Sequence, residues 1–103
     1  MNSFVVNLYP KPNDTAPSQN LTVAATAVQF NPVTFDYKTN AFFVTVHTAP
    51  IIVTFDGSTP TAANGHVLQN NWSGWWSRDA AIAAKLLRHG GTSAVVTISQ
   101  FTN

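Results

Sequence analysis

Hydrophobic and polar positions alternate with a period of two along much of the chain, which predicts β-strands with one buried face. The alternation is clearest over residues 21–30, 41–48 and 94–101, where β-branched and aromatic residues are frequent. Shorter runs of similar character predict further strands at residues 3–9, 33–37, 51–56 and 66–69. The pattern therefore indicates a mainly β protein.

Turn-forming residues separate these runs. Residues 11–20 contain two prolines among Asn, Asp and Ser, and residues 56–65 contain Asp-Gly, Thr-Pro and Asn-Gly, so both segments are predicted loops. An Asn-Pro pair at residues 31–32 predicts a further turn. The short link at residues 47–50 predicts that the strands on either side of it form an antiparallel hairpin.

One segment departs from the strand pattern and predicts a helix. Ser77 is a suitable N-cap, Asp79 lies in the predicted first turn, and residues 80–87 are good helix formers with apolar side chains on one face. The glycine pair at residues 90–91 supplies the C-cap. Many short strands and one late helix predict an antiparallel β-sandwich or small jelly-roll-like barrel, with residues 1–103 as a single domain.

The composition changes this picture at the surface. The chain has 103 residues and no cysteine, so apolar packing and backbone hydrogen bonds must hold the fold together. Only 9% of the residues are charged, against about 25% in ordinary soluble domains, and the net charge is +1. Such a surface hardly repels copies of itself, so we expect a homo-oligomer or a subunit that other protein chains cover.

Several classes of function are not expected. The first ten residues lack the basic and apolar regions of a secretory signal, and no apolar run approaches the roughly 20 residues of a membrane span. Basic residues are few and scattered, which argues against a nucleic-acid partner. We expect synthesis in the cytoplasm, with neither membrane nor nucleic acid as partner.

The candidate chemistry is sparse. His47, His66 and His89 follow no metal-binding spacing, and the simpler interpretation places His89 at a helix end and His47 beside a hairpin turn. Ser58, His66 and Asp56 could be combined into a triad, but no nucleophile elbow is present, and Asp56 with Ser58 is more typical of a turn cap. We therefore predict no catalytic residue, no cofactor and no metal, and hence no enzyme.

Three tryptophans within five positions are the sharpest feature of the sequence. On a strand, Trp72 and Trp76 share one face and Trp75 lies on the other, so at least one ring is hard to bury. Three interpretations stay open: core packing, an anchor in a subunit interface, and a platform for stacking sugars, with Ser73 and the neighbouring asparagines as polar partners. Trp72, Trp75 and Trp76 are the candidate interface.

Three pieces of sequence carry a resemblance. They are residues 55–68 (FDGSTPTAANGHVL), 86–91 (LLRHGG) and 93–98 (SAVVTI). Together they resemble a pattern in small virion-associated proteins of tailed bacteriophages, over roughly the C-terminal half of the chain. The resemblance implies a viral structural protein located in the virion, either a capsid decoration (cement) protein or another minor subunit. Its partners would be capsid or other virion proteins. The alternative is a carbohydrate- or receptor-binding β module that uses residues 72–76.

Overall fold

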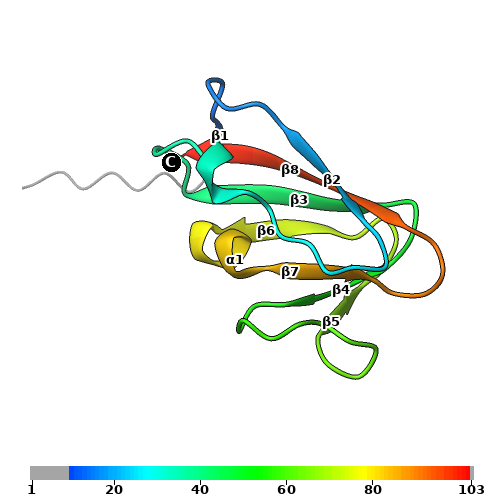
Figure 1. The fold of residues 1–103 in the computed structure, drawn as a ribbon. Helices are drawn as coiled ribbons and strands as arrows, with labels where there is room; N and C mark the ends of the chain where they lie inside the picture. Colours follow the sequence, from blue (N-terminus) through cyan, green and yellow to red (C-terminus); the bar gives the residue numbers. More distant parts are fainter. Residues whose placement is uncertain (1–9, 103) are drawn as a thin grey trace, which may run out of the picture.

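The computed structural model describes residues 10–102 and shows a mainly β, sandwich-like fold (Figure 1). The strand predicted at residues 3–9 lies outside the described residues. Within residues 10–102 the strands form two antiparallel sheets. Sheet A contains β1 (Lys11–Pro12), β2 (Gln19–Val23), β3 (Ala41–His47), β6 (Ser73–Ser77) and β8 (Ala94–Thr102). Sheet B contains β4 (Ile51–Thr54), β5 (His66–Leu68) and β7 (Lys85–Arg88).

Strand β8 is the centre of sheet A. It pairs with β3 along one side and with both β2 and β1 along the other, and β3 pairs in turn with β6. In sheet B, β4 lies between β5 and β7. The predicted alternation in β3 and β8 is confirmed, because every second side chain of each strand is buried.

The core lies between the sheets and is almost entirely aliphatic and aromatic. Sheet A contributes Phe42, Val44 and Ile98, and sheet B contributes Ile51 and Leu86, all fully buried. Each such aliphatic side chain stabilises the fold by about 1.5–3 kcal/mol relative to exposure in water. In the absence of cysteine, this burial holds the two sheets together, and backbone hydrogen bonds join the strands within each sheet.

The predicted hairpin between β3 and β4 is wrong. The two strands belong to different sheets, and the link of residues 48–50 carries the chain from sheet A to sheet B. Thr48 has a φ of 78°, a left-handed conformation that turns the chain sharply after His47. All four residues of β4 are buried, and such a strand is more stable at the centre of its own sheet. His47 therefore lies beside a link between sheets and not beside a hairpin turn.

The predicted helix is only half correct. Helix α1 spans Arg78–Ala83, and Ser77 caps it as expected by accepting a bond from the Ala80 amide. Residues 85–88 form strand β7 instead of continuing the helix. Leu86 exchanges backbone hydrogen bonds of 2.8 and 2.9 Å with Val28, and β7 pairs with β4, so tertiary pairing overrides helix propensity there.

Several smaller predictions also change. His89 does not cap a helix, because β7 precedes it and its amide donates to the carbonyl oxygen of Pro50. The predicted strand at residues 33–37 is replaced by the 3-10 helix η1 (Pro32–Thr34), which Asn31 caps at the Val33 amide. The loop at residues 11–20 is interrupted by β1 and by the start of β2, which ends at Val23 and not at residue 30.

A buried polar cluster fixes the end of sheet A near β1. The side-chain amide oxygen of Gln100 accepts bonds from the Asp36 amide (2.9 Å) and the Thr39 hydroxyl (2.7 Å). Asn13 donates to both Thr39 and Asp36. The guanidinium of Arg78, at the start of α1, donates to the carbonyl oxygens of Asp36 and Thr39 at 2.8 Å. In the described residues no buried side-chain nitrogen or oxygen lacks a partner, so this cluster is fully satisfied.

Candidate functional site

Three aromatic rings meet on the outer face of sheet A, and we call Phe43, Trp75 and Phe101 the outer aromatic patch. Phe43 and Trp75 are direct partners across β3 and β6, with ring centroids 5.2 Å apart. The edge-to-face contact between Trp75 and Phe101 has a centroid distance of 4.8 Å. Trp75 is 50% exposed although it touches both neighbours. A large ring held in place but open to water is a suitable anchor for a partner surface.

The strand register explains why these rings meet. Ala41 of β3 pairs with Phe101 on one side and with Ser77 on the other. Its small side chain leaves room for the Trp75 ring to reach across β3 to Phe101, two strands away. The buried cluster around Gln100 fixes the same end of β8, next to Phe101 in sequence. The patch therefore lies next to an end of the sheet that buried hydrogen bonds attach to the preceding loop.

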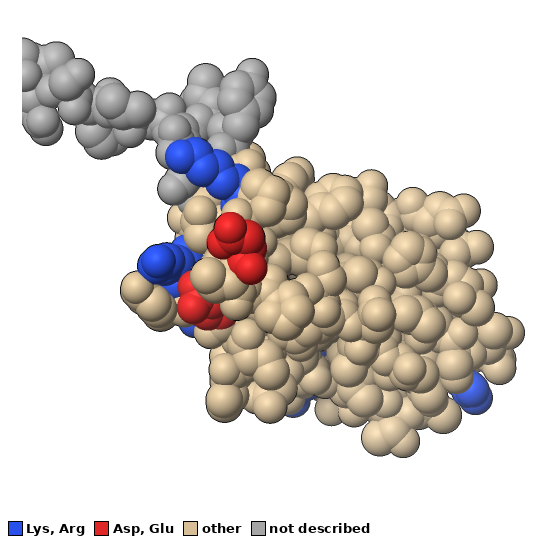
Figure 2. Space-filling model, turned by 90° about the horizontal axis from the view of Figure 1, so that it is seen from above, with Lys and Arg blue, Asp and Glu red and all other residues tan. Residues whose placement is uncertain are grey.

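Ionic side chains are scarce on the outer face of sheet A around the patch. The outward residues of β2, β3, β6 and β8 include no Asp, Glu, Lys or Arg in these described strands. Hydroxyl and amide groups take their place, and several bond to one another across strands, as Thr97 does to Asn20 at 2.7 Å. Figure 2 shows the adjoining side of the molecule, where charged side chains gather mainly at the end near β1. The low overall charge is thus unevenly distributed.

The structure divides the three tryptophans that the sequence singled out. Trp76 is buried between the sheets, where its ring meets Phe55 edge-on at 5.3 Å. Trp72 is partly buried and folds over Gly74, where an added Cβ would lie 2.6 Å from the indole ring. Only Trp75 is half exposed, which confirms the predicted split between the two faces of the strand. Core packing therefore describes Trp76 and most of Trp72, and the surface position belongs to Trp75.

Sequence reasoning missed the two partners of Trp75. Phe43 and Phe101 both occupy outward positions of strands that were predicted, so the period-two pattern could have placed each of them on the exposed face. Their meeting with Trp75 depends on the strand order β8-β3-β6, which places distant segments side by side. No local sequence signal reports that order.

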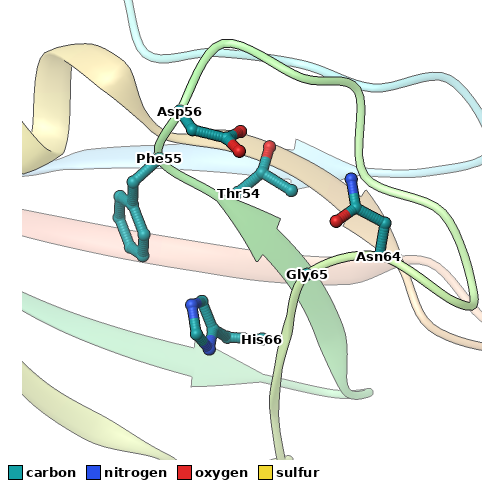
Figure 3. A pocket seen from close by; sticks show the side chains of 6 residues that line it. All are labelled: Thr54, Phe55, Asp56, Asn64, Gly65 and His66. Atoms are coloured by element: carbon teal, nitrogen blue, oxygen red, sulfur yellow. The ribbon is translucent and has the colours of Figure 1, made fainter.

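A second feature is an open cleft at the end of β4. It has a volume of about 360 Å³, and we call it the Asp56 cleft. Figure 3 shows its six lining residues around one hollow, with Phe55 and Asn64 on opposite sides and Asp56 and His66 along the other two. The lining residues are Thr54, Phe55, Asp56, Asn64, Gly65 and His66. The loop of residues 56–65 forms much of this wall.

Ser58, His66 and Asp56, which the sequence allowed as a triad, are not arranged for nucleophilic catalysis. In a triad the histidine stands between the carboxylate and the hydroxyl. Here the Ser58 hydroxyl donates directly to the Asp56 carboxylate at 2.6 Å, and the Ser58 amide donates to the same oxygen at 3.0 Å. These two bonds lower the pKa of Asp56 below its ordinary 3.8 and confirm the turn-cap interpretation.

The remaining candidate chemistry is limited. The three histidines lie apart, at the end of β3, in β5 and after β7. No cluster of three or more His, Asp or Glu side chains suitable for a metal ion occurs within residues 10–102. Over the same residues no helix is long and apolar enough to cross a membrane. Comparison with protein-family models, with curated protein sequences and with solved structures finds no match to this chain.

Proposed function

We propose that this chain is a structural accessory protein of a bacteriophage virion, which binds the particle in many copies as a capsid decoration protein or another minor subunit. The observation that carries the proposal is the outer aromatic patch, which lies on a face whose described strands β2, β3, β6 and β8 contain no Asp, Glu, Lys or Arg. The resemblance of residues 55–68, 86–91 and 93–98 to small virion-associated phage proteins supports the same function.

The proposed mechanism is adhesion without chemistry. Trp75 would fill a hollow on the partner protein, while Phe43 and Phe101 hold its ring and exclude water around it. The hydroxyl groups of the same face would form the polar rim. On a symmetric shell many weak contacts act together if the subunits also touch each other, because binding of one copy raises the effective concentration for the next.

Binding to particles tests this proposal. The purified protein is mixed with capsids of the phage whose genome encodes it, assembled without this protein, and co-sedimentation is measured. We expect the wild-type chain to bind and Trp75→Ser to lose most of the binding. Tyr37→Ser is the matched control, because Tyr37 is an aromatic residue that is 82% exposed and is not one of the three patch rings.

Absence of binding to capsids, together with a monomeric state, would contradict the proposal. A wild-type chain that stays in the supernatant with capsids, and that sediments as a monomer at high concentration in analytical ultracentrifugation, excludes a virion subunit. Equal binding by the Trp75 and Tyr37 variants would keep the virion role but remove the patch as its anchor. Unchanged thermal unfolding of both variants shows that any loss is not a loss of fold.

A carbohydrate- or receptor-binding module is the second candidate, and the exposed ring of Trp75 favours it. Ser73 and Ser77 flank Trp75 on the same face of β6 and are exposed, so hydroxyl groups lie beside an aromatic surface. Screening against a glycan array tests it. Binding that disappears in Trp75→Ala with the fold intact would support this function, and no binding to any glycan would remove it.

A further inference from the structure

The Asp56 cleft is built by a loop that is braced at many points. The Thr54 hydroxyl donates to the Ser58 carbonyl oxygen, and Thr61 and Asn64 exchange backbone bonds of 3.0 and 3.1 Å. The ammonium of Lys85 in β7 donates to the carbonyl oxygen of Gly57 at 2.8 Å. These bonds hold the loop of residues 56–65 in one shape, so its side chains are already positioned before any ligand arrives.

Gly65 is essential to that shape. Its φ is +136°, and an added Cβ would lie 2.8 Å from Cγ1 of Ile52 and 3.0 Å from the carbonyl oxygen of Val53. Only glycine lets the chain approach β4 this closely, which brings the loop back to the strand it left. The close approach places Asn64 across the hollow from Phe55, and His66 beside Phe55 and across from Asp56 (Figure 3).

Two oxygen atoms of the cleft have no hydrogen-bond donor among the described residues. One Asp56 oxygen, Oδ1, accepts both bonds from Ser58, while Oδ2 accepts none within the described part of the chain. The amide nitrogen of Asn64 donates to the Ser58 hydroxyl at 3.1 Å, which fixes the amide plane and leaves its Oδ1 without a donor among residues 10–102. Asp56 Oδ2 and Asn64 Oδ1 can therefore accept hydrogen bonds from hydroxyl groups of a ligand.

Aromatic groups form the rest of the wall. Phe55 is 37% exposed, and its ring centroid lies 6.2 Å from that of the exposed His66. Phe55 is held from behind by its edge-to-face contact with Trp76. C–H groups on the face of a sugar ring pack against such rings, and a volume of about 360 Å³ falls at the lower end of the roughly 300–1,000 Å³ of small-molecule sites. The cleft is therefore large enough for a small ligand.

We propose that the Asp56 cleft binds a neutral saccharide, with ligand hydroxyls donating to Asp56 and Asn64 and one sugar face packing on Phe55 and His66. The charge favours a neutral ligand over an ion. The negative charge of the Asp56 carboxylate disfavours binding of anions. The ammonium of Lys85 donates to the carbonyl oxygen of Gly57, and its positive charge nearby weakens the attraction of Asp56 for cations. This site lies at the end of sheet B and shares no residue with the outer aromatic patch.

Nuclear magnetic resonance titration tests the proposal. Methyl glycosides of neutral hexoses and N-acetylhexosamines are added to the ¹⁵N-labelled protein, with glucuronate and glucosamine as charged comparisons. We expect amide shifts confined to residues 54–58 and 64–67 for at least one neutral glycoside, and smaller shifts for both charged sugars. Asp56→Asn keeps an acceptor for Ser58 but removes the charge, and should weaken binding about tenfold. Phe55→Leu should weaken it about fivefold.

Trp75→Ser is the control that separates this site from the outer aromatic patch. It should leave the saccharide shifts unchanged while it loses most of the binding to particles. Asp56→Asn should weaken saccharide binding about tenfold and leave binding to particles unchanged. Titration of every glycoside to its solubility limit without a shift at the cleft overturns the saccharide site and leaves the virion proposal intact. Loss of the shifts in Trp75→Ser, or equal binding by Asp56→Asn, also overturns it. Spectra of the free variants establish that each is folded.

Discussion

Gln100 continues the inward side of β8, where the alternation of Ala94, Val96 and Ile98 would call for an apolar residue. It is only 3% exposed, and it replaces apolar packing with three hydrogen bonds to residues 34–39. A fully paired buried amide specifies one arrangement of the chain around it. The segment before β3 is therefore attached to β8 by a polar contact that strand patterning does not reveal.

Replacing Gln100 with alanine should be costly. The change leaves the Asp36 amide, the Thr39 hydroxyl and the Thr34 carbonyl oxygen without their partner, and we expect the free energy of unfolding to fall by about 3 kcal/mol. Urea denaturation followed by tryptophan fluorescence measures the loss. Ser99→Ala, on the adjacent outward position of β8, is the control and should change it by less than about 0.5 kcal/mol. Equal effects of the two changes would refute the role of the cluster.

Two aspartates give the protein a predictable response to acid. The bond from Asn13 is the main cause that lowers the pKa of Asp36 below 3.8, and the Ser58 hydroxyl does the same for Asp56. A carboxyl group whose pKa is lower in the folded state stabilises the fold above its unfolded pKa of about 3.9, and this contribution is lost as the pH falls through the folded value. Stability should therefore decline below about pH 4.

Unfolding midpoints in urea, measured across that pH range, test the prediction. The double variant Asp36→Asn and Asp56→Asn should lose part of the acid-dependent decline, because its amides do not titrate. Asp56 is exposed and Asp36 is only partly buried, so the change in slope will be modest. A double variant with the same pH profile as the wild-type chain would show that neither carboxyl group contributes.

Strand β7 offers a test of how the segment after α1 is stabilised. Leu86 is fully buried between the sheets, whereas Leu87 is partly exposed. Leu86→Ala should reduce the free energy of unfolding by about 3 kcal/mol, and Leu87→Ala by clearly less. A continued helix would place both leucines on the same buried face and make the two losses similar. Chemical denaturation of both variants distinguishes these outcomes.

The strands with a strict alternation could be predicted from sequence, and those fixed by distant partners could not. The side-chain pattern predicts strands β3 and β8, and Ser77 as an N-cap residue predicts the start of α1. Strand β7 has the composition of a helix, and only its pairing with β4 and Val28 makes it extended. Side-chain alternation could assign Trp75 to an exposed position. Its contacts with Phe43 and Phe101 depend on the order of the strands in the sheet, so they could not be predicted.

The distribution of charge over the molecule predicts how its proposed binding responds to salt. The outer face of sheet A offers aromatic rings and hydroxyl groups, and its strands β2, β3, β6 and β8 contain no Asp, Glu, Lys or Arg in the described part of the chain. Raising the ionic strength from about 0.1 to 1 M shortens the Debye length from about 10 to 3 Å and weakens charge-based association. Co-sedimentation with particles should therefore be unchanged or stronger in high salt. Dissociation of the protein by salt would show that charged surfaces carry the contact instead.

The central position of β8 also governs when the protein can fold. Strands β1, β2 and β3 all take hydrogen-bond partners from residues 94–102, although they are synthesised long before them. During translation, the first half of sheet A must wait until this stretch has left the ribosome. Until then the buried face of β3 lacks the side chains of β8 that pack beside it; this face consists of Phe42, Val44 and Val46. Nascent chains that stall before residue 94 should consequently be targets for chaperones and proteases.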